Sequence, residues 1–292
     1  MNQEVWTPLK ILQWAVPYLT QKGIKTARLD AESLIAFALG IDRLKVYLQF
    51  DRPLNPSELD LLRDFMKRRA NHEPLQYILG RREFHGNSFM VEPGVLIPRP
   101  ETEHLVETAL EYLKKNNWES PKILDLGTGS GCIAISIAKA YQVEVWGVDL
   151  SQKALEIAGK NANVLHPGGY YHWRLGNWFE ALTQEDPEKY HVIVSNPPYV
   201  LEREKEDLDE EIRLFEPEEA LFAGEDGLKA YQALSQVLEQ RLIPGGVALF
   251  ELHSHNVEKI KKTFEGFPGQ QKVLPDLQGL PRVLCLETSS IR

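Results

Sequence analysis

The chain has 292 residues, a length that fits two ordinary domains or one large one. Hydrophobic residues make up 43% and charged residues 26%, which is typical of a globular protein that buries a sizeable core. No apolar run reaches the roughly 18 residues of a bilayer-spanning helix. Two cysteines are too few for a disulfide framework or a cysteine-rich metal site. The first residues lack the basic and then apolar pattern of a secretory signal, so we expect a cytoplasmic protein.

The formal net charge is −9, and most of it lies in one segment. Residues 202–219 contain ten acidic and three basic residues and therefore carry a net charge of −7. This segment is either a solvated loop and helix or a docking face for a basic partner. The acidic balance argues against a protein that grips nucleic acid through its phosphates.

The first 72 residues are predicted to form a small helical bundle. Thr7 and Pro8 are typical of a helix start, and apolar residues then recur at helical spacing. A second helix is predicted over 30–39, and a third from Ser57, with Asp60 three residues later as a capping pair. No catalytic motif occurs here, so we interpret this part as a partner-binding or lid module.

The remainder of the chain is predicted to contain a β-hairpin linker and then alternating strands and helices. Turn signals flanked by β-forming residues place the hairpin within 73–97, and a helix is expected over 101–115. Strands are then predicted at 122–126, 143–150, 170–175, 191–195 and 247–252, and helices at 131–140, 151–165, 227–243 and 257–264. This alternation predicts an α/β, doubly wound, Rossmann-like sheet that is mostly parallel. The last two strands, near 271–274 and 283–287, are joined too closely for a parallel crossover, so an antiparallel C-terminal hairpin is expected.

A glycine-rich motif follows the first strand of this predicted sheet. Residues 125–132 are Asp-Leu-Gly-Thr-Gly-Ser-Gly-Cys, and the glycines allow a sharp turn and close approach of the backbone to a ligand. The spacing differs from the G-x-G-x-x-G of dinucleotide folds, and no P-loop lysine is present. Asp125 disfavours a nearby pyrophosphate and suits a cationic amino-acid group. Asp149 ends the next strand, where a ribose diol needs an acceptor. The glycine motif alone could be only a tight turn, but together these residues predict a site for S-adenosylmethionine.

A second motif, Ser195-Asn196-Pro197-Pro198-Tyr199, follows the fourth predicted strand. Open parallel sheets bind ligands beyond the carboxyl ends of their strands. Asn196 offers an amide oxygen, and the prolines offer carbonyls without competing N–H groups. Such an array can hold an –NH2 group and aim its lone pair, while Tyr199 can stack on a planar substrate or stabilise a sulfonium methyl.

With these two motifs the chain resembles class I S-adenosylmethionine-dependent methyltransferases that act on planar nitrogen, and more closely the release factor glutamine methyltransferase family. The resemblance covers nearly the whole chain. It includes the N-terminal helices, residues 73–84 and 96–103, both motifs, Glu216-Pro217 with Ala220-Leu221, and Asp276, Gly279 and Arg282. The short Asn-Pro-Pro-Tyr sequence also occurs in adenine and cytosine amino-methyltransferases, so the specificity comes from the combination.

The resemblance implies methylation of the side-chain amide nitrogen of the glutamine in the Gly-Gly-Gln motif of class I peptide chain release factors. It implies a substrate-recognition domain over 1–72, a linker over 73–97 and a methyltransferase domain over 98–292. No metal, direct nucleic-acid contact or membrane contact is implied. The implied cofactor, S-adenosyl-L-methionine, would be bound by Gly127, Thr128, Gly129, Ser130, Gly131, Asp149, Trp178 and Asn196. The implied substrate site consists of Asn196, Pro197, Pro198 and Tyr199, of which Asn196, Pro197 and Tyr199 are the catalytic candidates.

Two positions need separate comment. Many family members have Asp before the aromatic residue of the adenine pocket, whereas this chain has Asn177, which can accept a hydrogen bond without charge. Arg99 would contact either the cofactor carboxylate or the seam between the domains.

A carboxamide nitrogen is a poor nucleophile because its lone pair is delocalised into the carbonyl. The hypothesis is that Asn196 Oδ1 and the Pro197 carbonyl accept its two N–H hydrogens and localise that lone pair. Three alternatives remain open. A DNA or RNA amino-methyltransferase would use the same pocket but should carry a basic face. A dinucleotide-dependent oxidoreductase has a different glycine spacing, and a non-catalytic binding module would have lost cofactor positions that are filled here.

Overall fold

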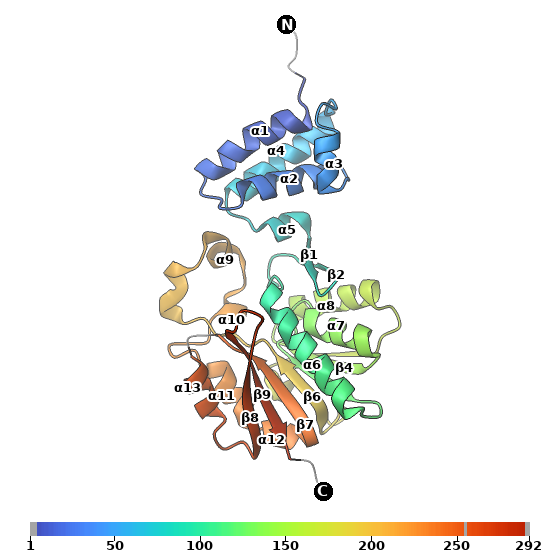
Figure 1. Ribbon diagram of the computed structural model, residues 1–292, viewed down its shortest axis with the longest axis vertical. Coiled ribbons are helices and arrows are strands. Elements are labelled where there is room, and N and C mark those ends of the chain that lie inside the picture. The colour runs from blue at the N-terminus through green and yellow to red at the C-terminus, as the bar shows by residue number, and fades with distance from the viewer. Residues whose placement is uncertain (1–4, 254–255, 290–292) are drawn as a thin grey trace. The chain divides into compact units, whose positions relative to one another are not determined.

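The computed structural model describes residues 5–253 and 256–289 and consists of two compact units (Figure 1). The first unit is helical and comprises Met1–Gly80 and Asp209–Phe215, and the second comprises Arg81–Leu208 and Glu216–Arg292. Residues 1–4, at the start of the segment that lacks a secretory-signal pattern, lie outside the described residues. Among the residues that are described, no helix is both long and apolar enough to cross a membrane.

The helical unit packs its helices around one apolar core. Ala15, Leu19, Leu34 and Ile35 are completely buried in it. The elements of the unit are α1 (Pro8–Gln21), α2 (Ala27–Ala38), α3 (Arg43–Leu48), α4 (Pro56–Ala70), α5 (Leu75–Leu79) and α9 (Glu210–Phe215). The short helices α3 and α5 were not predicted, because five or six residues are too few to show a helical apolar period.

The start of α4 differs from the prediction. Its capping box joins Asn55 and Glu58: Asn55 Oδ1 accepts from the Glu58 N–H at 2.9 Å, and Glu58 Oε2 accepts from the Asn55 N–H at 2.9 Å. The predicted pair of Ser57 and Asp60 was therefore wrong. Pro56 occupies the first helical position, so the helix begins before Ser57. Proline is tolerated there because a backbone N–H at this position has no acceptor within the helix. At α1, Thr7 caps the helix as expected.

A buried cation organises the charges of the helical unit. Arg69 on α4 pairs with Asp30 on α2 at 2.7 Å, and the two side chains are only 5% and 3% exposed. The Nη2 atom of Arg69 also contacts Glu211 on α9 at 2.7 Å. Beside it, His72 lies 2.8 Å from Glu210, and Lys25 pairs with Asp209. These three acids of the acidic segment are thus paired within the unit, so neither a purely solvated loop nor a free docking face describes them.

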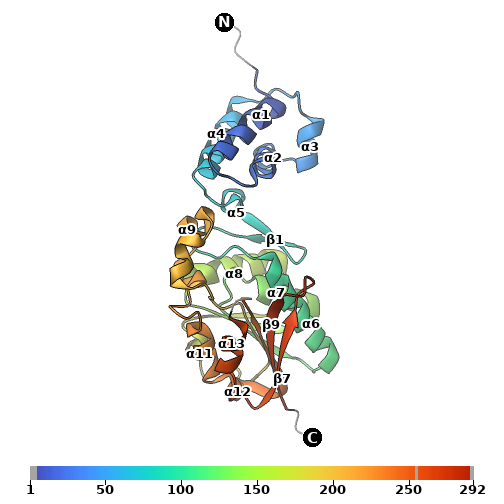
Figure 2. The ribbon, with the colours of Figure 1, turned by 60° about the vertical axis from the view of Figure 1, so that its left-hand side comes forward.

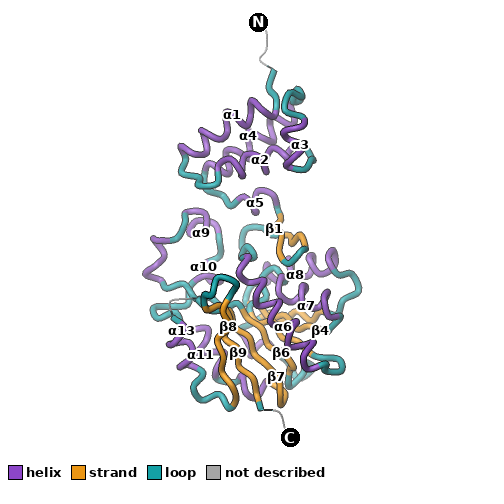
Figure 3. Tube along the Cα trace, in the orientation of Figure 1, coloured by secondary structure: helices purple, strands orange, loops and turns teal. Residues whose placement is uncertain are grey.

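The larger unit is built on a seven-stranded sheet, whose strands are orange in Figure 3. The order across the sheet is β5-β4-β3-β6-β7-β9-β8. The pairs from β5 to β7 are parallel, and the pairs β7–β9 and β9–β8 are antiparallel. The strands are β3 (Lys122–Leu126), β4 (Glu144–Asp149), β5 (Tyr171–Leu175), β6 (Tyr190–Ser195), β7 (Leu242–Glu251), β8 (Gly269–Pro275) and β9 (Pro281–Thr288). The predicted α/β, doubly wound, mostly parallel sheet with an antiparallel C-terminal hairpin is confirmed.

Helices cover both faces of this sheet, because neighbouring strand residues point to opposite sides. Ile123 and Leu124, for example, belong to different core clusters. One face is covered by α6 (Glu103–Asn116), α7 (Cys132–Tyr141) and α8 (Gln152–Leu165), and the other by α11 (Lys229–Ser235), α12 (Leu238–Arg241) and α13 (Val257–Thr263) (Figure 2). The remaining short elements are β1 (Arg81–Phe84), β2 (Asn87–Met90), η1 (Pro100–Thr102), η2 (Trp178–Ala181), η3 (Glu202–Asp207) and α10 (Glu218–Leu221).

Two predicted elements differ from the observed ones by more than a few residues at their ends. The helix predicted over 227–243 is split into α11 and α12, because Val237 leaves the helical region at φ −128°, and β7 begins before the predicted residue 247. The predicted hairpin is present as β1 and β2 and belongs to the larger unit, whereas α5 belongs to the helical unit. The chain first passes from the helical unit to the larger one after Gly80, which ends α5 with a left-handed φ of 69°.

The strand order places a crevice at one end of the sheet. The strand β3 has β4 on one side and β6 on the other, so the order reverses there. At such a switch point the connections leave in opposite directions and open a crevice beyond the carboxyl ends of the strands. Both predicted motifs follow these ends, one after β3 and one after β6.

The buried pair in the helical unit predicts a stability effect. Arg69→Leu should lower the free energy of unfolding by about 3–5 kcal/mol, because it leaves Asp30 buried without its partner. Arg63→Leu on the same helix is the matched control. It removes only an exposed pair with Asp60 and should cost less than about 1 kcal/mol. Thermal melts of both variants, followed by circular dichroism, measure the difference. Equal melting temperatures would contradict the importance of the buried pair.

Candidate active site

The glycine loop after β3 is fastened to the neighbouring strand β4. The N–H groups of Gly127 and Thr128 both donate to the Val148 carbonyl, at 2.8 and 2.9 Å. Gly127 has a φ of 76°, and a Cβ atom there would lie 3.6 Å from the ring of Trp178. The glycine therefore allows both the left-handed turn and the close approach of the aromatic ring.

Asp125, at the end of β3, holds this loop from beneath. Its Oδ2 atom accepts from the Thr128 hydroxyl at 2.7 Å and from the Ala134 N–H at 3.2 Å. The side chain is completely buried, and Oδ1 is buried without a hydrogen-bond partner. Burial raises the pKa of Asp125 to about 7, against the opposing effect of these two hydrogen bonds. Asp125 therefore organises the loop and does not line the pocket described below.

Asp149, at the end of β4, presents a fixed carboxylate. Its Oδ2 atom accepts from the Gly129 N–H at 2.8 Å, and its Oδ1 atom accepts from the Ser151 N–H at 2.9 Å. Burial raises the pKa of Asp149, and these two backbone donors oppose the shift. Each oxygen keeps a second acceptor site, so a pair of hydroxyl groups could bind there.

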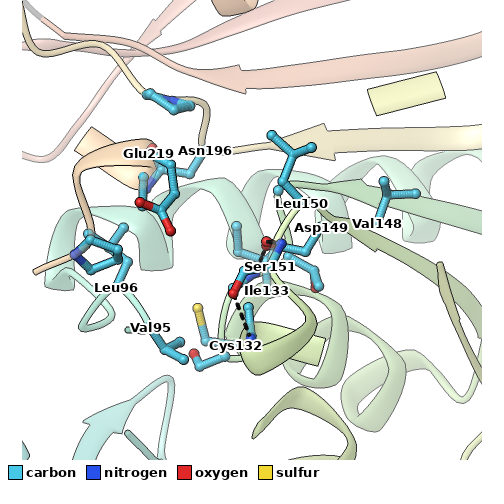
Figure 4. Close-up of a pocket in the computed structure, with 18 of the residues that line it drawn as sticks. Val95, Leu96, Cys132, Ile133, Val148, Asp149, Leu150, Ser151, Asn196 and Glu219 are labelled. Carbon is cyan, nitrogen blue, oxygen red and sulfur yellow. Dashed lines mark hydrogen bonds between the residues drawn. The ribbon is translucent and has the colours of Figure 1, made fainter. Parts of the chain in front are cut away.

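A pocket opens between these two strand ends and the second motif (Figure 4). It encloses about 930 Å³ of empty space, part of which is open to solvent. Of the predicted residues, Gly127, Thr128, Gly129, Ser130, Asp149, Trp178, Asn196 and Pro198 line it. The sequence motifs that lie far apart in the chain are thus gathered around one cavity.

The charge of the pocket is negative. The carboxylates of Asp149 and Glu219 both line it, and Figure 4 shows the Glu219 side chain directed into it. Arg99 also lines it, but both carboxylate oxygens of Glu216 lie 2.7–2.8 Å from its Nη2 atom, which neutralises its charge. Such a site favours a cationic ligand and disfavours a pyrophosphate, which argues against the dinucleotide alternative.

The second motif provides acceptors at the rim of the pocket. Asn196 donates from Nδ2 to the Thr102 hydroxyl oxygen at 3.1 Å, which leaves Oδ1 as its acceptor atom. Tyr199 stacks on His253, with ring centroids 5.0 Å apart, and lines a smaller adjoining cavity that Asn196 also lines. Burial raises the pKa of Tyr199 to about 12, so its hydroxyl is neutral at physiological pH. Pro197 is buried and lines neither cavity.

Two further predicted positions lie outside the pocket lining. Gly131 is buried in packing: a Cβ atom there would lie 2.8 Å from Ile135 and 3.1 Å from Ala158. Its role is to let α7 and α8 approach each other. Asn177 is exposed and does not line the pocket, whereas Gly176 and Trp178 on either side of it do.

Several lining residues were not predicted as site residues. Gly94, Val95 and Leu96 come from the segment interpreted as a linker, and Leu150, Ser151 and Ala154 follow Asp149. Glu219 belongs to the acidic segment. Apart from Arg99, the Leu96–Glu103 stretch was predicted only through the family resemblance, and Thr102 within it also lines the pocket. Among the residues that the structure describes, no cluster of three or more His, Cys, Asp or Glu could hold a metal ion.

Comparison with known proteins gives the family. The release factor glutamine methyltransferase of Geobacter sulfurreducens is 42% identical over 262 residues, which cover 89% of each chain. The chain belongs to the release factor glutamine methyltransferase family. Its relative in Bacillus subtilis is 35% identical over 96% of this chain and 97% of that one.

Two family models match separate parts of this family member. A PrmC N-terminal domain matches residues 10–80, and a methyltransferase small domain matches residues 102–221. Two solved structures share the fold at low identity. A methyltransferase from Pyrococcus furiosus has a TM-score of 0.51 and 16% identity over 70% of this chain and 90% of its own. The 16S rRNA N2 G1207 methyltransferase of T. thermophilus has a TM-score of 0.52 and 22% identity over 71% of this chain and 49% of its own.

The buried carboxyl of Asp125 predicts a pH-dependent stability. In the unfolded chain this group ionises near pH 3.8, whereas in the folded chain it keeps its proton until about pH 7. The contribution of this carboxyl to the free energy of unfolding is therefore complete below about pH 4 and is lost as the pH rises to 7. The loss corresponds to roughly 4 kcal/mol for such a shift.

Asp125→Asn should remove this dependence, so the drop in melting temperature between pH 5 and pH 8 should be smaller than in the wild type. Melts at both pH values measure it. Glu239→Gln, which changes an exposed carboxylate on α12, is the control and should keep the wild-type dependence. If the melting temperature of Asp125→Asn dropped as much as that of the wild type, Asp125 would not be the group that loses a proton near pH 7.

Proposed function

We propose that this family member transfers a methyl group from S-adenosyl-L-methionine to the side-chain amide nitrogen of the glutamine in the Gly-Gly-Gln motif of class I peptide chain release factors. The observation that carries the proposal is the position of Asn196 at the rim of an anionic pocket, with its amide oxygen available as an acceptor. The names of its relatives, which are release factor glutamine methyltransferases, support the same substrate.

The cofactor site of this proposal is formed by the loop after β3 and the end of β4. The Gly127–Ser130 backbone borders the methionine part, the Asp149 carboxylate accepts from the ribose hydroxyls, and Trp178 lies against the adenine side. The negative charge of Asp149 and Glu219 suits a positively charged ligand. When bound there, S-adenosyl-L-methionine supplies an electrophilic methyl group. Gly131, which the sequence predicted to bind the cofactor, has only a packing role in this proposal.

The residues of the second motif orient the substrate amide. Asn196 Oδ1 accepts one N–H of the glutamine amide. The other is assigned to the carbonyl of Pro197, which lies outside the pocket lining but between two lining residues, Asn196 and Pro198. Both hydrogens are then held in the plane of the acceptors, so the nitrogen lone pair is directed away from them. Pro198 and Tyr199 border the planar amide, and Tyr199 is held by its stacking on His253. These fixed dipoles act without a strong base, because the nitrogen becomes acidic only as the new bond forms.

The helical unit is the substrate-recognition domain in this proposal, and the protein acts in the cytoplasm, where release factors work. A DNA or RNA amino-methyltransferase would use the same acceptor motif, but the acidic charge of the chain and the names of its relatives do not favour it. Contact with nucleic acid or membrane is therefore no part of the proposed function.

Incubation with S-adenosyl-L-methionine and a purified class I release factor tests this function. We expect peptide mass mapping to find one added methyl group on the glutamine of the Gly-Gly-Gln peptide. Asn196→Ala should bind the cofactor within a few fold of wild type and transfer the methyl about a hundredfold more slowly. Asn196→Asp should be slower than wild type and faster than Asn196→Ala, because it keeps an acceptor but adds a charge. A methyl group on another residue, or full activity of Asn196→Ala, would overturn the proposed chemistry.

The ribose contact predicts a loss of cofactor affinity. Asp149→Ala should weaken binding of S-adenosyl-L-methionine at least about tenfold, since each lost charge-assisted hydrogen bond costs roughly 1.5–3 kcal/mol. Glu144→Gln, at the opposite end of the same strand and paired with His172, is the matched control and should bind normally. Calorimetric titration measures both. Unchanged affinity in Asp149→Ala would remove this carboxylate from the site.

A further inference from the structure

Three side chains beside the pocket form a chain of contacts. Asn196 donates from Nδ2 to Thr102 Oγ1 at 3.1 Å, and the Thr102 hydroxyl faces the carboxyl of Glu251 and opposes the rise of its pKa. The Oε2 atom of Glu251 is buried without a hydrogen-bond partner. Thr102 is 2% exposed and Glu251 is 1% exposed, so water does not compete for these contacts.

The sheet itself brings Asn196 and Glu251 close together. The strands β6 and β7 are parallel, and Ser195 is the register partner of Phe250. Asn196 directly follows β6, and Glu251 is the last residue of β7, so both lie at the same end of these neighbouring strands. Thr102, the partner of Asn196, ends η1, which precedes α6.

A hydroxyl group has only one proton, and this limits the directions that hydrogen bonds among these three side chains can take. Thr102 has one hydroxyl proton, and an ionised Glu251 can only accept, so the proton goes to the carboxylate. The Thr102 oxygen then offers only lone pairs to Asn196 and must be met by Nδ2. The Oδ1 atom of Asn196 is consequently turned away from Thr102.

A protonated Glu251 would remove this constraint. It could donate to Thr102, whose hydroxyl would then be free to donate to Asn196 Oδ1. The amide of Asn196 could turn over, and the acceptor needed by the substrate would be occupied. The orientation of Asn196 is thus coupled to the charge of a carboxyl that touches neither substrate nor cofactor.

We propose that Glu251, acting through Thr102, is a positioning residue that fixes the amide of Asn196 with Oδ1 available to the glutamine of the substrate. The inference rests on the proposed role of Asn196 and extends it to two residues outside the Asn-Pro-Pro-Tyr motif. The ionised form of Glu251 is the active one.

The surroundings of Glu251 place its titration near neutral pH. Burial raises the pKa of Glu251 to about 7, the Thr102 hydrogen bond and two nearby cations oppose this shift, and Glu101 adds to it. Burial also raises the pKa of Tyr199 and Cys132 to about 12, and that of Tyr231 well above its usual value, so these three stay neutral. The ionisable groups that face Glu251 are Arg99, Glu101, Cys132, Tyr199, Tyr231 and Arg282. The rate of methyl transfer should therefore fall as the pH drops through about 7.

Variants of Thr102 test this relay, in which Glu251 orients Asn196 through the Thr102 hydroxyl. Thr102→Val is nearly isosteric but removes the hydroxyl, so kcat should fall at least about tenfold, the effect of losing one buried hydrogen bond of roughly 1.4 kcal/mol. The affinity for S-adenosyl-L-methionine should stay within about threefold. Thr102→Ser keeps the hydroxyl and should recover most of the lost rate. Thr108→Val on α6 is the matched control, because this buried threonine donates only to the His104 carbonyl of its own helix.

The pH profile of kcat tests the charge of Glu251. Glu251→Gln removes the carboxyl that takes up a proton, so the decline of kcat below about pH 7 should disappear. Because burial also raises the pKa of Asp125 to about 7, Asp125→Asn is the necessary control and should keep that decline. All rates are measured on the intact chain with a release factor as substrate.

The outcomes separate this inference from the proposed function. If Asn196→Ala is inactive while Thr102→Val matches Thr108→Val, the relay is overturned and the role of Asn196 stands. A pH decline that persists in Glu251→Gln, or disappears in Asp125→Asn instead, also overturns it. Should Thr102→Val fail to fold, Thr102→Ser and the Glu251→Gln profile still decide. Full activity of Asn196→Ala would remove the role of Asn196 itself.

Discussion

The parallel pairing of β3 with β4 on one side and β6 on the other is the constraint on which the site depends. It brings the glycine loop, Asp149 and Asn196 to one edge of the sheet, although up to about seventy residues of chain separate them. The same pairing supplies the Val148 carbonyl that holds the loop. Because the register of β6 and β7 is also fixed, Glu251 lies level with Asn196. The pocket is therefore a consequence of strand order, and the loops around it only complete its walls.

Three carboxyl groups at this edge are used in different ways because their partners differ. Asp125 is completely buried and keeps one oxygen on the loop it supports. Asp149 is held by two backbone N–H groups and faces the pocket. Glu251 is buried against Thr102, beyond the pocket wall. Desolvation raises the pKa of all three, because burial makes their negative charge costly. A cationic ligand between Asp149 and Glu219 would offset part of that cost.

The acidic segment has two distinct structural roles. Asp209–Phe215 belongs to the helical unit, where its acids meet Arg69, His72 and Lys25. Glu216 and Glu219 belong to the larger unit, where one neutralises Arg99 and the other lines the pocket. Part of this run of like charge thus becomes a set of specific pairs, because four of its acids are brought to bases from distant parts of the chain: Asp209, Glu210, Glu211 and Glu216.

The sequence by itself determined the fold class and most of the pocket. Alternating apolar strands and amphipathic helices leave few arrangements other than a doubly wound sheet, and the residues after its strand ends must lie at the crevice. Only the tertiary structure decided which glycine packs and which lines the pocket, because Gly127 and Gly131 differ in their neighbours and not in their type. It also decided the partners of Arg99, Arg69 and Thr102. Each of these contacts joins residues 39 or more positions apart, and no local pattern encodes such a pairing.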